Sequence, residues 1–152
     1  MLRLVAIGRD GNRNPHVEAV SDIVVDVVAA TVQMYAEVGF APPWIGYLAV
    51  VNDVCVGACG FKMAPKHGRA EIAYFTFPDH ERRGYATSMA RALVDVAGAA
   101  DPRVIVTAQT LPEKNASTRI LEKLGFRLRG PVEHPEDGTV WQWELFGAGA
   151  PL

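Results

Sequence analysis

Short apolar runs and helical apolar stripes alternate along the chain and together predict its secondary structure. The runs are rich in Val, Ile, Phe and Tyr and are bounded by Gly, Pro, Asn or Asp, which is typical of β-strands between turns. We interpret the run at 71–77 as a strand buried on both faces, because most of its residues are β-branched or aromatic. The predicted strands cover residues 2–7, 44–51, 54–63, 71–77 and 103–108.

Apolar residues at helical spacing predict three helical regions. The first consists of one or two helices, since both Asn14 and Ser21 favour a helix start. The second ends at Gly98, because glycine is common just after the last helical residue. The regions cover residues 15–38, 86–97 and 116–124.

The C-terminal part predicts two further strands separated by a polar loop. Phe126 begins the first strand, residues 130–138 form the loop, and residues 140–146 alternate between apolar and polar positions. The resulting order is β, α, three β, α, β, α and two β. Strands joined by short turns pair antiparallel, whereas a strand–helix–strand unit gives a parallel pair. The sequence therefore predicts an α/β fold whose mixed sheet has antiparallel N-terminal strands and a central parallel pair.

Length, composition and charge narrow the class of protein. The 152 residues fit a single domain spanning 1–152, and a hydrophobic fraction of 49% argues against disorder. A net charge of -2 and the absence of a basic block argue against a nucleic-acid partner. No apolar run has the length of a membrane span and no secretory signal is visible, so we expect a cytoplasmic protein without a membrane partner.

Two pairs of residues have structural interpretations. Cys55 and Cys59 lie on one face of a predicted strand, too far apart for a disulfide, so we expect reduced core residues. No second Cys/His pair with ligand spacing accompanies them, so we expect no metal. Phe40 and Trp44 flank two prolines and either line a pocket or anchor their loop at the edge of the core; we favour the anchor.

The segment between the strand at 71–77 and the next helix is short and basic. Such a loop exposes backbone N–H groups at a helix N-terminus, where the helix dipole favours an anion. Arg82 and Arg83 add positive charge beside Gly84. The segment therefore fits a pyrophosphate site, although a glycine and two arginines also occur in ordinary exposed connections.

Two motifs, found in this order, resemble the GNAT superfamily of N-acetyltransferases, and the resemblance spans about Trp44 to Phe146. The family's acetyl-CoA loop has the pattern Gln/Arg-x-x-Gly-x-Gly/Ala, and residues 81–86 read Glu-Arg-Arg-Gly-Tyr-Ala. Residues 115–126 read Asn-Ala-Ser-Thr-Arg-Ile-Leu-Glu-Lys-Leu-Gly-Phe. This is similar to the Asn-x-Ser…Leu-Glu-Lys-x-Gly-Phe ending of the ribosomal-protein N-terminal (RimJ/RimL-like) branch. The resemblance implies a GNAT-like mixed sheet with helices on both faces.

The resemblance also implies transfer of an acetyl group from acetyl-CoA, the co-substrate, to a primary amine without a metal. It places the pyrophosphate on the backbone from Arg82 to Thr87 and the pantetheine arm against Asn115. A backbone amide of the central strand would stabilise the oxyanion of the attacked thioester. The implied cofactor-binding residues are Phe75, Thr76, Phe77, Arg82, Arg83, Gly84, Tyr85, Ala86, Thr87, Asn115 and Ser117.

The sequence departs from the family pattern at two positions. Glu81 opens the loop, and a carboxylate would be repelled by pyrophosphate, so we expect it to point outward. Leu121 stands where many members have a tyrosine that protonates the leaving thiolate. Ser117 lies one helical turn earlier on the same face and is the candidate that replaces it.

An amine must lose a proton before it attacks, and Glu71 is our candidate base. It opens the central strand in an otherwise apolar run, where partial burial would suit a base; the alternative is a solvent-exposed strand end. His80 is a second candidate. We interpret Tyr74 and Tyr85 as packing residues.

Two rival functions differ in class from an acetyltransferase. A non-catalytic acyl-CoA-binding or sensor domain would have the same fold, and Leu121 favours it. The second rival function, a nucleotide site of an unrelated α/β protein, has the least support, since no lysine follows Gly84 as in a Walker loop. The sequence does not choose among peptide N-termini, small amines and antibiotics as the acceptor. A homodimer is one assembly to consider. We expect residues 15–44 and 130–138 to select the acceptor.

Overall fold

The computed structural model describes residues 1–13 and 21–148, which form three helices and a seven-stranded sheet. A short 3₁₀ turn, η1 (Pro78–His80), precedes the second helix. The helices are α1 (Asp22–Val38), α2 (Tyr85–Ala100) and α3 (Ala116–Lys123). The strands are β1 (Arg3–Ala6), β2 (Gly46–Val51), β3 (Val54–Phe61), β4 (Arg69–Thr76), β5 (Ile105–Thr110), β6 (Arg127–His134) and β7 (Gly138–Leu145).

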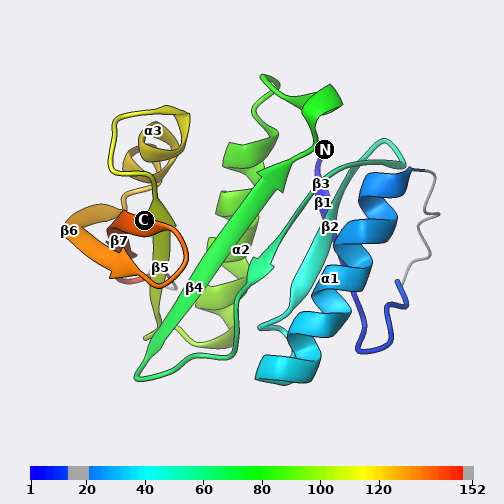
Figure 1. Cartoon of the computed structure of the whole chain (residues 1–152), viewed down its shortest axis with the longest axis horizontal. Coiled ribbons are helices and arrows are strands. Elements are labelled where there is room, and N and C mark those ends of the chain that lie inside the picture. Colours follow the sequence, from blue (N-terminus) through cyan, green and yellow to red (C-terminus); the bar gives the residue numbers. More distant parts are fainter. Residues whose placement is uncertain (14–20, 149–152) are drawn as a thin grey trace.

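The strands lie in the order β1-β2-β3-β4-β5-β7-β6 (Figure 1). Strands β1 to β4 pair antiparallel, β4 and β5 pair parallel, and β7 pairs antiparallel with both β5 and β6. The predicted mixed sheet with one parallel step at its centre is confirmed.

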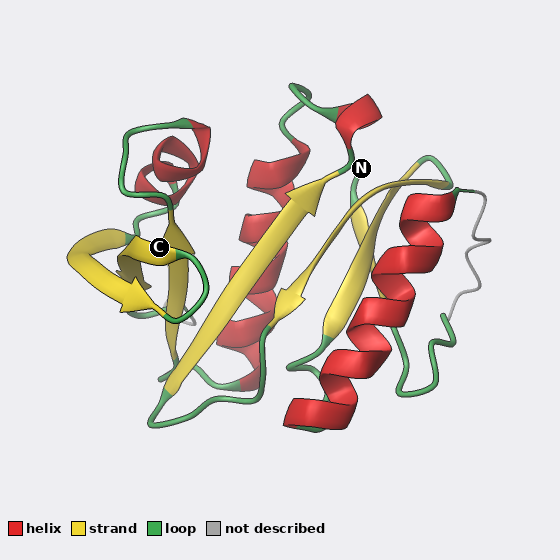
Figure 2. Cartoon of the chain, in the orientation of Figure 1, coloured by secondary structure: helices red, strands yellow, loops and turns green. Residues whose placement is uncertain are grey.

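The parallel step between β4 and β5 is short. It consists of three residue pairs, from Arg69–Ile105 to Glu71–Thr107. Beyond these pairs the two strands diverge, and Figure 2 shows them separating toward the C-terminal end of β4. The second half of β4 is therefore paired with β3 on one side and forms an open edge on the side that faces β5.

Two glycines show that α1 and α2 pack on opposite faces. A Cβ atom at Gly46 would lie 2.7 Å from Thr31 Cγ2 of α1, and one at Gly57 would lie 3.0 Å from Met89 Cε of α2. Gly46 pairs with Gly60, and residues 57 and 60 point to opposite faces of β3 because side chains alternate along a strand. The expected placement of helices on both faces is confirmed (Figure 1).

Tyr35 fixes α1 to the end of the sheet. Its hydroxyl donates a hydrogen bond to the Ile7 carbonyl at 2.8 Å and accepts one from the Gly46 N–H at 2.9 Å. The side chain is buried, which raises the pKa of its phenol. Because both partners belong to other segments, Tyr35 sets the position of α1 relative to β2.

Helix α2 is longer than predicted. It continues through the buried Gly98 to Ala100 and is capped at Asp101, so the prediction that Gly98 ends the helix is wrong. Alanine is the best helix former, and the alanines on both sides of Gly98 keep the chain helical. A residue without a side chain also suits this buried position.

The predicted polar loop at 130–138 is wrong as well. Strand β6 runs to His134 and β7 starts at Gly138, so the two strands form a hairpin. Most side chains of β6 are exposed because it is the outer strand, and its sequence therefore lacks an apolar pattern. Pro131 fits there because an edge strand has one side without ladder bonds.

Strand β4 is buried on one face only, which corrects the expectation of burial on both. Ala70 and Ile72 are buried, whereas Ala73 is exposed and Phe75 is 49% exposed. Helix α1 lies over β1 and β2 and leaves this part of β4 uncovered (Figure 2). The uncovered face is available to a ligand.

The remaining structural expectations have different outcomes. Phe40 packs edge-on against Tyr35 and Trp44 against Phe61, each with ring centroids 5.0 Å apart, so the anchoring interpretation is confirmed. The two cysteines are free thiols, as expected. The predicted helix start at Asn14 lies outside the described residues. Among the described helices, none is long and apolar enough to cross a membrane.

Candidate active site

The open edge of β4 presents backbone groups that no strand uses. The Phe77 N–H donates to the Val56 carbonyl of β3 at 2.9 Å. Bonds of an antiparallel ladder recur at every second residue, so odd-numbered residues of β4 face β3 and even-numbered residues face β5. Because the pairing of β4 with β5 ends at Glu71, the N–H and C=O groups of Tyr74 and Thr76 have no partner among the strands of the described residues.

This alternation distinguishes the three strand residues expected to contact acetyl-CoA. The amide of Phe77 is already bonded to β3, and its side chain is buried. Phe75 turns its backbone toward β3 and leaves its ring half-exposed. Of the three, Thr76 is the residue whose amide faces the open edge.

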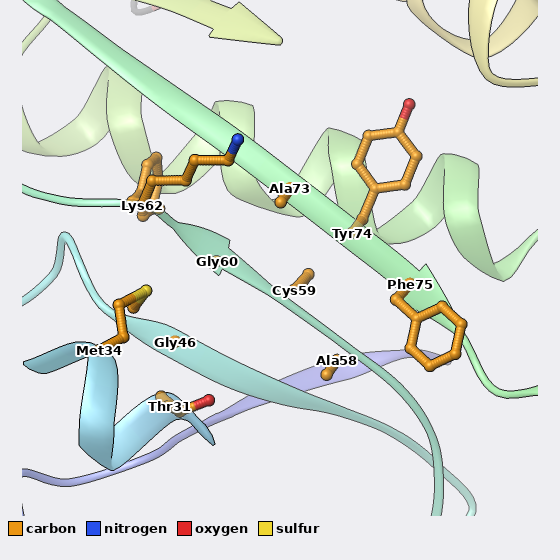
Figure 3. Close-up of a pocket in the computed structure, with 11 residues that line it drawn as sticks. Thr31, Met34, Gly46, Ala58, Cys59, Gly60, Lys62, Ala73, Tyr74 and Phe75 are labelled. Atoms are coloured by element: carbon orange, nitrogen blue, oxygen red, sulfur yellow. The ribbon is translucent and has the colours of Figure 1, made fainter. Parts of the chain in front are cut away.

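Ser117 and Tyr74 meet across the diverging strands. Ser117 is half-buried on α3, and its hydroxyl lies near the Tyr74 phenol and interacts with it. Burial raises the pKa of Tyr74, and the polar contact with Ser117 acts in the opposite direction. Figure 3 shows the Tyr74 ring on the side of β4 opposite to Phe75. Tyr74, interpreted from sequence as a packing residue, is thus a polar partner of a predicted site residue.

Asn115 caps α3 two residues before Ser117. Its Oδ1 accepts from the Thr118 N–H at 3.0 Å, and its own N–H donates to Thr118 Oγ1 at 2.9 Å. This capping box fixes the start of the helix and hence the place of Ser117. Within residues 1–13 and 21–148, no hydrogen bond involves the side-chain Nδ2 of Asn115, which is therefore free to donate to a ligand.

The two departures from the GNAT pattern differ in consequence. Glu81 is exposed, in agreement with the expectation that it points away from an anion. Leu121 is fully buried in the core. An apolar side chain there cannot supply a proton.

The start of α2 is open to a ligand. Gly84 is the N-cap with φ 79°, and Arg82 also has a positive φ, 65°. Helix geometry leaves the amides of Tyr85, Ala86 and Thr87 without intrahelical acceptors. A Cβ atom at Gly84 would meet nothing within 4 Å, and both arginines of the loop are exposed. Free amides, positive charge and open space fit a pyrophosphate.

Glu71 lies where β4 and β5 begin to diverge, and it is paired with Lys62. The Glu71 Oε2 and Lys62 Nζ atoms are 2.5 Å apart, and the glutamate side chain is 25% exposed. Glu71 is therefore neither a fully exposed strand end nor an isolated acid. Sequence reasoning missed Lys62, because the two residues become neighbours only through the register of β3 with β4.

A groove of about 220 Å³ lies between α1 and the uncovered part of β4. Thr31 and Met34 of α1 line one side, and Ala73 and Phe75 line the other (Figure 3). Tyr74 also belongs to its lining, so the groove and the Ser117 contact share a residue. Among the described residues, no group of His, Cys, Asp or Glu is arranged to hold a metal ion.

Comparison with known proteins identifies the family. The sequence model described as "Acetyltransferase (GNAT) domain" matches residues 16–127. The chain belongs to the GNAT acetyltransferase family. The resemblance carried by the two motifs is confirmed.

Curated relatives match part of this GNAT chain. The uncharacterized N-acetyltransferase YoaA of Bacillus subtilis (strain 168) is 30% identical over 99 residues, 63% of this chain and 56% of YoaA. The uncharacterized N-acetyltransferase p20 of Bacillus licheniformis is 32% identical over 80 residues, 52% of this chain and 45% of p20. The chain thus spans about half the length of these relatives.

Solved structures show the same fold at low sequence identity. A spermidine N-acetyltransferase SpeG chimera from Vibrio cholerae and hSSAT has a TM-score of 0.71 at 14% identity, covering 97% of this chain and 96% of that one. An apo ribosomal L7/L12 alpha-N-protein acetyltransferase, RimL, has a TM-score of 0.70 at 17% identity, covering 96% of this chain and 93% of RimL. The putative acetyltransferase yncA from Salmonella typhimurium, with its cofactor acetyl-CoA, has a TM-score of 0.61 at 17% identity, covering 81% of this chain and 73% of yncA.

Proposed function

We propose that this GNAT chain transfers the acetyl group of acetyl-CoA to a primary amine by direct attack in a ternary complex. The observation that carries the proposal is the unpaired edge of β4, which runs from Glu71 past Tyr74 and Thr76 toward the start of α2. Free backbone groups along a strand edge suit an arm that contains amides. The yncA structure, described with acetyl-CoA, supports this choice of co-substrate.

The residues present fit the parts of acetyl-CoA. The amides at the start of α2, with Arg82 and Arg83, would bind the pyrophosphate. The backbone of Thr76 and the Nδ2 of Asn115 would bind the pantetheine arm from two sides. When bound, acetyl-CoA supplies an acyl group activated as a thioester.

The reaction forms a C–N bond, breaks a C–S bond and moves a proton from nitrogen to sulfur. Glu71 accepts the amine proton through a water molecule, because the Lys62 ammonium already occupies one of its oxygens. The Thr76 N–H stabilises the oxyanion. Ser117, in polar contact with Tyr74, donates a hydrogen bond to the departing sulfur and relays a proton to it, and the proton held by Glu71 returns through water to restore the Ser117 hydroxyl.

A thiol-release assay with acetyl-CoA and a panel of primary amines tests the proposal, together with calorimetric binding of acetyl-CoA. We expect release that requires both the protein and an amine. Glu71→Gln should lower kcat by about 100-fold or more, whereas Glu37→Gln on the exposed side of α1 should leave it unchanged. Equal rates for the two variants would remove Glu71 from the mechanism.

The rival function is a non-catalytic acyl-CoA-binding domain, and the buried Leu121 is the observation that favours it. That rival predicts calorimetric binding of acetyl-CoA without thiol release for any amine. The two readouts therefore separate the functions.

A further inference from the structure

The groove between α1 and β4 has a floor with few side-chain atoms. Gly46, Ala58 and Gly60 form this floor (Figure 3). A Cβ atom at Gly60 would lie 2.6 Å from the Ile45 carbonyl oxygen, and one at Gly46 would clash with α1. The close packing of β2, β3 and α1 therefore keeps the floor free of larger side chains.

The groove is apolar and holds the volume of one ring. Met34, Ala73 and the half-exposed ring of Phe75 form its walls. Its volume is about 220 Å³. An apolar cavity of about 150 Å³ is enough to bind benzene. An aromatic ring or a branched aliphatic chain would thus fill the groove and remove the surface of Phe75 from water.

Charge at the groove disfavours an acceptor with several positive groups. Among the described residues that line the groove, Lys62 is the one with an ionised side chain. The carboxylate next to it, Glu71, is already paired with that lysine. A polycation would meet the Lys62 charge and find no free carboxylate in the lining, and like charges repel in a partly desolvated site.

The groove adjoins the part of β4 where acetyl transfer is proposed to occur. Tyr74 contributes to its lining and is in polar contact with Ser117 on the other side of β4. A ligand held against Ala73 and Phe75 is therefore next to the strand segment that is unpaired on the side facing β5.

We propose that the acceptor is a monoamine whose apolar group, an aromatic ring or a branched aliphatic chain, lies in the groove while its amino group points to the open edge of β4 beside Tyr74. This inference rests on the proposed acetyl transfer and names its substrate class. A free arylalkylamine and a peptide with an aromatic N-terminal residue share this chemistry.

The experiment compares kcat/KM for four acceptors, which are 2-phenylethylamine, a tripeptide with N-terminal phenylalanine, ethylamine and spermidine. We expect 2-phenylethylamine or the tripeptide to exceed ethylamine and spermidine by at least about tenfold, a typical return for filling an apolar pocket. Whichever of the first two is preferred identifies the free amine or the peptide as the source.

Two substitutions test the groove itself. Ala58→Leu adds volume at the floor and should raise KM for 2-phenylethylamine at least about tenfold, with a smaller effect on ethylamine. Ala30→Leu makes the same change on the exposed side of α1 and should leave both values unchanged. Lys62→Met removes the positive charge and should raise the kcat/KM ratio of spermidine to 2-phenylethylamine.

Calorimetric binding of 2-phenylethylamine to the protein loaded with coenzyme A separates the inference from the proposed function. Suppose that 2-phenylethylamine binds, that Ala58→Leu weakens this binding, and that no thiol is released. This result would support the groove as the binding site and would reject acetyl transfer. Thiol release with spermidine or ethylamine at rates above those of both apolar acceptors would overturn the inference and leave acetyl transfer standing. Equal effects of Ala58→Leu and Ala30→Leu would also overturn it.

Discussion

The Tyr74 phenol and the Ser117 hydroxyl are in polar contact where β4 and β5 diverge. Tyr74 belongs to the central strand and Ser117 to α3, so this contact connects the two sides of the opening. Leu121 leaves the position of the family's tyrosine apolar, and Tyr74 is a phenol in contact with Ser117. In the proposed mechanism this pair takes the place of a single acid.

A double-mutant cycle tests the pair. Ser117→Ala should lower kcat by about 10- to 100-fold with little change in KM for acetyl-CoA, because a donor to the departing sulfur acts mainly in the transition state. Tyr74→Phe should have a smaller effect, and the double variant should be no slower than Ser117→Ala alone. Additive losses would show that the residues act independently, and a wild-type rate for Ser117→Ala would assign the proton to water.

Gly84→Val should weaken acetyl-CoA binding by at least about tenfold. A side chain there would occupy the open space above the loop, and φ 79° is unfavourable for valine. Gly68→Val is the matched control, because Gly68 has φ 74° and is equally open but lies in the turn before β4. Calorimetry should show weaker binding for the first variant alone. Equal losses for both would indicate general strain instead of a pyrophosphate site.

Asn115 should have two separable roles, one as a helix cap and one as a ligand donor. Asn115→Asp keeps the oxygen that accepts from Thr118 and removes the Nδ2 donor, whereas Asn115→Ala removes both. We expect the aspartate variant to keep thermal stability but raise KM for acetyl-CoA several-fold, consistent with a bond worth about 1 kcal/mol. The alanine variant should also lose about 1 kcal/mol of unfolding free energy. An unchanged KM for Asn115→Asp would leave Asn115 as a cap only.

Cys59 should make the protein lose stability at alkaline pH. Burial raises the pKa of its thiol from 9.0 to about 12. Between these values the unfolded chain releases a proton that the folded chain retains. The free energy of unfolding therefore falls as pH rises, by up to about 1.4 kcal/mol per pH unit, and this contribution to the slope fades below about pH 8.

Urea unfolding at several pH values between 8 and 11 measures this slope. Cys59→Ala should have a shallower slope than the wild type. Part of the slope should remain above pH 10, because burial also raises the pKa of Tyr47 to about 12. Parallel slopes for the wild type and the variant would show that Cys59 does not titrate in this window.

Sequence reasoning succeeded where local chemistry determines structure. Turn residues and hydrophobic periods predicted the order of the elements. The loop before α2 and the start of α3 were predicted because each is a contiguous motif in the sequence. It failed where partners come from distant segments. The pairing of Lys62 with Glu71 depends on strand register, and the contact of Tyr74 with Ser117 depends on how α3 packs beside β4. Strand β6 was missed because an outer strand needs no apolar pattern.

The short seam between β4 and β5 has the geometry of a pivot. Three residue pairs, with the buried Glu144 bonded to Arg69 and Arg129, join the two halves of the sheet at one end. Thr76 lies five residues beyond the last pair, roughly 16 Å along an extended strand, so a rotation of about 5° at the seam displaces it by roughly 1.4 Å. Small changes of angle at Glu71 are thereby magnified at the far end of the opening, which is where the proposed acetyl transfer brings the thioester and the acceptor together.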